Sequence, residues 1–104
     1  MSCVRNDVVL LPFPFSDLAS HKVRPAVVIG TNSQNDLFLV PVTSQGSNID
    51  LPLVDWRLSG LNVPCGIKAQ LATIEERLIL KVLGRLTARD RQNLDGRLRN
   101  WLKL

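Results

Sequence analysis

The chain has 104 residues, of which 45% are hydrophobic and 21% are charged, so its composition excludes a disordered protein. This length is typical of one domain with a single core, which we expect to span residues 1–104. The longest apolar run, Val8–Phe15, contains two prolines and falls short of the about 20 residues that a bilayer span needs. The N-terminus lacks the pattern of a signal peptide. We therefore expect no membrane segment and a cytoplasmic location.

Metal-ligating residues are scarce. The chain contains two cysteines, Cys3 and Cys65, and one histidine, His21. These cannot form a disulfide framework or a four-ligand zinc site, so we expect no metal and no cofactor. Cys65 is expected to be a buried, inert thiol.

The basic excess lies at the C-terminal end of the chain. Residues 85–104 hold six basic and two acidic side chains, and this local net charge of +4 equals that of the whole chain. Such a segment permits an acidic partner or nucleic acid without requiring either.

The first half of the chain predicts three strands. Asp7–Phe13 is rich in Val and Leu and predicts a buried strand, ended by proline. The polar segment Ser16–Val23 predicts a loop, and Arg24–Thr31 a second strand. Asn32–Asp36 has turn composition, so Leu37–Thr43 should be a third strand, antiparallel to the second.

The second half predicts shorter elements. We expect a strand over Ile49–Val54, one helical turn over Asp55–Gly60, and strands within Val63–Gln70 and Leu78–Leu86. Asp55 is expected to cap the helical turn, and the glycine at position 60 to end it.

A C-terminal amphipathic helix follows. Thr87 and Asp90 fit a capping signature, with a hydroxyl at the N-cap and a carboxylate three residues later. An apolar stripe at helical spacing is expected to form core or interface, and comprises Leu94, Leu98, Trp101 and Leu102. The fold class is therefore mainly β, a small barrel of five to seven mostly antiparallel strands with one packed helix.

One pair of side chains suggests an anion site. Arg24 opens the second strand directly before a proline, and its guanidinium carries a fixed fork of donors that matches a phosphate. Thr43 and Ser44 end the next strand. A five-residue turn joins the two strands, so these groups should meet at one end of the hairpin. A solvated barrel rim is the alternative interpretation.

Other titratable groups point less clearly to chemistry. His21, in the loop before the second strand, is either simply exposed or a phosphate contact or proton donor. Glu75 and Glu76 are adjacent, and on a strand they would face opposite sides, which argues against a shared acid–base site.

The segments DVVLLPFPFSDLASHKVRPAVVIG, VPVTSQ, LPLVDWRLSGL, IKAQLATIEERLI and LGRLT, in this order, resemble the MazF/PemK-like toxins of bacterial toxin–antitoxin systems. The resemblance implies an SH3-like barrel that forms a homodimer and needs no metal. It also implies an endoribonuclease that cleaves single-stranded mRNA, a cognate antitoxin partner, and DNA binding together with that antitoxin.

The family's functional arginine and threonine correspond to Arg24 and Thr43, which we therefore expect to be catalytic. Their expected role is to stabilise negative charge on the phosphoryl group, because a guanidinium is a poor base at neutral pH. Residues assigned to RNA contact are Asp17, His21, Lys22, Ser44, Gln45, Lys68 and Gln70.

The chain departs from its relatives at two positions. Ala69 stands where many have an acidic residue, so we expect no carboxylate there, and Ile67 replaces a basic residue found in some members. Two other functions therefore stay open: a non-enzymatic inhibitor that binds DNA gyrase through its C-terminal helix, and a degenerate barrel that only binds antitoxin or RNA.

Overall fold

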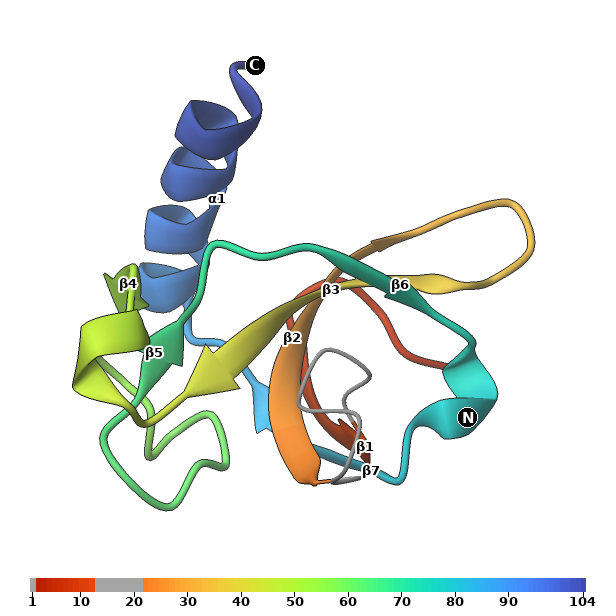
Figure 1. Cartoon of the computed structure of the whole chain (residues 1–104), viewed down its shortest axis with the longest axis horizontal. Helices are drawn as coiled ribbons and strands as arrows, with labels where there is room; N and C mark the ends of the chain where they lie inside the picture. Colours follow the sequence, from red (N-terminus) through yellow and green to blue (C-terminus); the bar gives the residue numbers. More distant parts are fainter. Residues whose placement is uncertain (1, 13–21) are drawn as a thin grey trace.

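The computed structural model describes residues 2–12 and 22–104, and within them a mainly antiparallel sheet carries one α-helix (Figure 1). The predicted fold class is confirmed. The strands are β1 (Asp7–Pro12), β2 (Val23–Thr31), β3 (Leu37–Thr43), β4 (Leu51–Pro52), β5 (Gly66–Ile67), β6 (Ala72–Ile74) and β7 (Lys81–Arg85). The helix is α1 (Ala88–Leu102), and the two 3-10 turns are η1 (Gly46–Asn48) and η2 (Glu76–Leu78).

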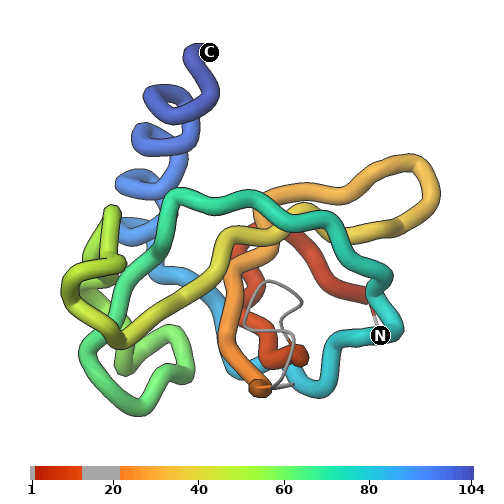
Figure 2. The backbone as a smooth tube through the Cα atoms, in the orientation of Figure 1, coloured from red at the N-terminus to blue at the C-terminus, as the bar shows by residue number. Residues whose placement is uncertain are grey.

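The sheet curves into an open barrel in which the strand order is β4-β5-β3-β2-β1-β7, with β6 also paired to β3. Strand β3 is where the sheet forks, because β6 pairs with its first residues and β5 with its last. Figure 2 follows the chain through this fork, with the segment between β5 and β6 crossing above β3. Helix α1 stands beside β4 and β5, and its C-terminal end projects away from the sheet (Figure 1).

Both faces of the central strands are buried, which explains why β1, β2 and β3 are almost continuously apolar. On one face Val8, Val27 and Val40 pack with Leu94 and Leu98 of α1. On the other face Val9, Leu11, Ala26, Val28 and Leu39 pack with Ala72, Ile74 and Ile79. The predicted apolar stripe of the helix divides accordingly: Leu94 and Leu98 are buried, whereas Trp101 is half-buried and Leu102 exposed.

The later strands are shorter than the sequence predicts. The strand expected over Ile49–Val54 is reduced to β4, and the one within Val63–Gln70 to β5, because prolines interrupt both segments. The expected strand Leu78–Leu86 begins only at Lys81, after η2. Strand β6 was not predicted, since three residues carry too little alternation to be recognised.

The turn 54–60 is clasped to the start of α1. Gly60 ends the turn with φ of 88°, as predicted. The capping role of Asp55 is wrong, because its carboxylate accepts hydrogen bonds from Thr87 and Arg89 instead. Thr87 is the N-cap of α1 and accepts from the Asp90 amide, but the Asp90 carboxylate accepts from the amides of Val54 and Asp55. The two acids thus tie the turn and helix together from both sides.

The described residues contain no helix that is both long and apolar enough to cross a membrane.

Candidate functional site

A β-bulge shifts the register between β2, which carries Arg24, and β3, which carries Thr43. Near the turn, Thr31 pairs with Leu37 and Gly30 with Phe38, and this register would bring Ser44 opposite Arg24. The register shifts by one between Val28 and Gly30, after which Ala26 pairs with Pro41. The β2–β3 pairing ends at Ala26 and Pro41, beyond which Arg24 pairs with β1 and Thr43 with β5. Counted on by two residues, the shifted register would make Thr43, rather than Ser44, the nearer residue to Arg24.

The bulge is held by the segment that precedes β1. The amide of Asn6 donates to Val28 O at 2.7 Å, and Arg5 Nη1 donates to Ile29 O at 2.5 Å. Arg5 Nη2 also contacts Asp95 of α1 at 2.7 Å. These bonds satisfy the carbonyls that the interrupted ladder would leave unpaired. No sequence pattern links Arg5 with position 29, so sequence reasoning missed this support.

Arg24 and Thr43 occupy the end of one buried sheet face. Because strand side chains alternate, Arg24 shares the face of Ala26 and Val28, and Thr43 that of Leu39. Both residues are half-buried, and so are neither packed inside the core nor isolated in solvent. Among the described residues no carboxylate lies within ion-pair distance of Arg24.

The Thr43 hydroxyl is oriented by its own chain. Thr43 Oγ1 accepts a hydrogen bond from the amide of Gln45 at 3.1 Å, which leaves the hydroxyl proton free to donate elsewhere. Gln45 in turn accepts from Asn48 Nδ2 at 2.8 Å. A threonine whose oxygen is fixed and whose proton is free is suited to bind a phosphate oxygen.

The remaining residues assigned to RNA contact separate into three groups. Lys22, Ser44 and Gln45 are exposed and flank Arg24 and Thr43 at the open end of the hairpin. Exposed Lys68 follows β5, two residues beyond the glycine that pairs with Thr43. Gln70 lies farther along and lines a groove against α1, so the structure does not bring it to this end. Asp17 and His21 lie outside the described residues.

Position 69 has no carboxylate of its own, as expected, but one from a distant part of the sequence lies beside it. Asp50 Oδ2 accepts a hydrogen bond from the amide of Ala69 at 2.7 Å, so an exposed carboxylate lies directly beside this position. Arg97 of α1 donates to the Asp50 carbonyl oxygen at 2.6 Å. The two positions are 19 residues apart, and only the pairing of β4 with β5 brings them together. Ile67, where some relatives are basic, is fully buried in the core.

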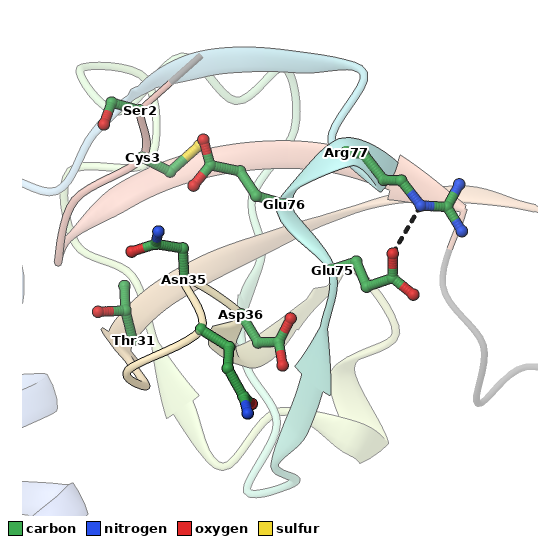
Figure 3. A pocket seen from close by; sticks show the side chains of 9 residues that line it. Ser2, Cys3, Thr31, Asn35, Asp36, Glu75, Glu76 and Arg77 are labelled. Carbon is green, nitrogen blue, oxygen red and sulfur yellow. Dashed lines mark hydrogen bonds and ion pairs between the residues drawn. The ribbon is translucent and has the colours of Figure 1, made fainter.

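The opposite end of the β2–β3 hairpin has the opposite charge. A hollow of about 540 Å³ lies at this end, lined by the hairpin turn, Ser2, Cys3 and η2. Figure 3 shows the side chains that line it. Asp36, Glu75 and Glu76 contribute three carboxylates, against one arginine, Arg77, which pairs with Glu75 at 2.6 Å. The two glutamates lie where η2 begins rather than on a strand, and their side chains point apart, Glu75 toward Arg77 and Glu76 toward Cys3 (Figure 3). An anion is therefore disfavoured here and favoured at the open end.

The two cysteines are structural. Burial raises the pKa of the Cys3 thiol, and the nearby carboxylates of Glu76 and Asp7 raise it further. Burial followed by the charge of Asp90 raises the pKa of Cys65, so both are poor nucleophiles at neutral pH. The prediction that Cys65 is buried is confirmed. In the part of the chain that the structure describes, no group of three or more potential ligands is arranged to hold a metal ion.

Two comparisons with known proteins were informative about the family of the chain. A search of curated proteins found no match. The model of one protein family, described as the PemK-like, MazF-like toxin of type II toxin–antitoxin systems, matches residues 4–102. This match spans nearly the whole chain, including every strand and the helix described above. The chain belongs to the PemK-like, MazF-like toxin family.

Proposed function

We propose that the protein is a metal-independent endoribonuclease that cleaves single-stranded mRNA in the cytoplasm. The observation that supports this proposal is the register of β2 and β3, in which the half-buried Arg24 and Thr43 follow the last pair, Ala26 and Pro41, at the same end of the hairpin. The charge distribution supports it, since the opposite end of the hairpin is acidic. Family membership supports a role as the toxin of a type II toxin–antitoxin system.

The proposed reaction is transfer of a phosphodiester to the neighbouring ribose hydroxyl. The 2′-oxygen attacks phosphorus, the bond from phosphorus to the 5′-oxygen breaks, and the 2′-proton leaves to a base while the 5′-oxygen gains a proton. The products are a 2′,3′-cyclic phosphate and a 5′-hydroxyl. Negative charge grows on the non-bridging oxygens in the transition state. The Arg24 guanidinium donates paired hydrogen bonds to these oxygens and Thr43 donates one more, which lowers the barrier.

We also propose that the protein acts as a homodimer through an apolar surface beside α1. Two hollows of about 360 and 170 Å³ share Leu71 and Leu102, and are otherwise lined by Phe38, Leu98 and Trp101 with smaller neighbours. Leu71 and Leu102 remain 49% and 44% exposed in the single chain. A second copy would cover this apolar surface.

The antitoxin that the family implies is proposed to carry an acidic segment that competes with RNA for the open end of the hairpin. Isothermal titration calorimetry tests this directly. Binding of the antitoxin should be weakened by a saturating non-cleavable RNA, whereas additive binding of both would contradict the proposal.

The activity itself is tested by the chemistry of the cleaved ends. Purified protein is incubated with unstructured RNA in excess EDTA, and the fragments are treated with polynucleotide kinase. The proposal predicts fragments whose 5′ ends accept phosphate directly and whose 3′ ends carry a cyclic phosphate. Intact RNA, or 5′-phosphate ends, would contradict it and favour a binding protein or a different hydrolytic mechanism.

A further inference from the structure

The turn 54–60 displays apolar side chains to solvent. Val54 and Leu58 are 53% and 75% exposed, although neighbouring Leu53 and Leu61 are buried in the core. Val54, Trp56, Arg57 and Leu58, which we call the turn surface, line a hollow of about 500 Å³ together with Asp55. Apolar side chains gathered around an open hollow indicate an interaction site.

The turn surface is rigid, so its exposure is not the result of a loose loop. The Asp90 carboxylate holds the amides of Val54 and Asp55 at 2.9 and 2.8 Å, and Arg89 holds the Asp55 carboxylate at 2.6 Å. A Cβ added to Gly60 would lie 2.2 Å from Leu83 O, which shows how closely the turn lies on β7. Because the geometry of the turn is already fixed, little conformational entropy of the turn would be lost when a partner binds.

The charge of the turn surface is positive. The Asp55 carboxylate is engaged by Arg89 and by the Thr87 hydroxyl, which leaves little negative charge to present. The Arg57 guanidinium lies 4.9 Å from the centre of the Trp56 ring, and no carboxylate within ion-pair distance of it is found in residues 2–12 and 22–104. Trp and Arg beside exposed aliphatic groups form the composition typical of binding hot spots.

The turn surface lies on the same side of the molecule as the candidate site. Thr43 pairs with Gly66, which pairs with Pro52, so these three residues form one rung across β3, β5 and β4. Val54 follows two residues beyond Pro52, in the direction in which β3 leaves the sheet. At about 4.8 Å per strand and 3.3 Å per residue, an extended segment of a few residues spans the distance from Thr43 to Val54.

We propose that the turn surface binds an acidic polypeptide segment with a large apolar side chain, and that the antitoxin supplies this segment. The apolar side chain enters the hollow between Val54 and Leu58, and a flanking carboxylate pairs with Arg57. The proposal rests on the proposed function only in naming the antitoxin as the source. A protein segment is favoured over RNA because aliphatic groups dominate the exposed area and Arg57 already covers a face of the Trp56 ring.

The test uses isotope-labelled full chain and a short acetylated peptide with a central Trp-Leu pair flanked by glutamates. Titration followed by NMR should shift the amides of residues 54–60 and the indole signal of Trp56. Leu58→Asp and Arg57→Glu should each weaken binding about tenfold or more. The matched controls are Leu80→Asp, which changes another exposed leucine, and Lys81→Glu, which makes the same change in net charge at another exposed site. Both controls should bind like the parent.

Three results would overturn the proposal. These are shifts confined to the groove beside α1, equal binding of a peptide with lysines in place of the glutamates, or tighter binding of an oligouridylate to the same turn residues. RNA cleavage by the same variants separates this proposal from the proposed function. Peptide binding without any cleavage by the parent would refute only the nuclease, whereas cleavage with an inert turn surface would refute only this inference.

Discussion

Replacement of Asp90 tests the clasp, by which we mean the hydrogen bonds from the amides of Val54 and Asp55 to the Asp90 carboxylate that join the turn 54–60 to helix α1. The Asp90 side chain is 1% exposed and accepts two backbone hydrogen bonds, from Val54 and Asp55. A hydrogen bond to a charged group contributes about 1.5–3 kcal/mol, and a buried donor left unpaired has a similar cost. Asp90→Ala should therefore lower the free energy of unfolding by about 3–5 kcal/mol. This is a large part of the about 5–15 kcal/mol typical of a small domain.

Urea denaturation of the parent and the variants measures this loss. Asp90→Asn retains one acceptor oxygen and should lose about half as much as Asp90→Ala. Asp95→Ala is the control on the same helix, because the ion pair of Asp95 with Arg5 is half exposed and should contribute less than about 1 kcal/mol. If the free energy of unfolding of Asp90→Ala lies within about 1 kcal/mol of the parent value, the Asp90 carboxylate does not hold the turn, and our explanation of its rigidity is wrong.

Further predictions concern packing, acid stability and assembly. Gly84→Ala should lose about 1–3 kcal/mol of stability in the same denaturation assay, because the new Cβ would lie 2.5 Å from Ser59 O. Gly96→Ala is the matched control: its new Cβ meets nothing within 4 Å, so this variant should gain up to about 1 kcal/mol. The hydrogen bonds that Asp55 accepts from Arg89 and Thr87 lower the pKa of its carboxyl group. The carboxylate therefore stabilises the fold above the pKa of the unfolded chain, and this stabilisation is lost as the pH falls through the lower, folded value. Asp55→Asn should flatten this part of a curve of stability against pH, and an unchanged slope would count against the assignment. Leu102→Asp should shift sedimentation toward a monomer, and an unchanged dimer would exclude the groove beside α1 as the interface.

The central hairpin was predictable from the sequence because its signals are local. Continuous apolar runs and a polar turn define β2 and β3 to within a residue, and the helix stripe with Thr87 defines the start of α1. The bulge at Ile29 was not predictable, since it depends on Arg5 and Asn6 from a distant segment. Counting residues along the hairpin predicts that Arg24 and Thr43 lie at its open end, but it does not predict the one-residue shift of register between Val28 and Gly30.

The candidate site was predictable only in part for the same reason. The carboxylate beside Ala69 comes from Asp50, and no spacing rule connects residues that meet through two strands of only two residues each. The capping interpretation of Asp55 failed because its carboxylate binds Arg89 and Thr87, whereas Thr87 caps α1 as predicted and the Asp90 carboxylate binds the amides of the turn instead. Local rules identified the correct residues here but assigned them the wrong partners.

The most direct test of the account is cleavage kinetics of Arg24→Ala, Thr43→Val and the double variant, on unstructured RNA in EDTA. Loss of the guanidinium should lower kcat about 100- to 1,000-fold, and loss of the hydroxyl about tenfold or more. If both groups bind the same phosphate, the double variant should lose less than the product of the two single effects. Ser44→Ala should retain activity, since the register after the bulge, counted on from Ala26 and Pro41, favours Thr43 over Ser44 as the neighbour of Arg24. Full activity of a folded Arg24→Ala variant, or a larger loss in Ser44→Ala than in Thr43→Val, would contradict the account.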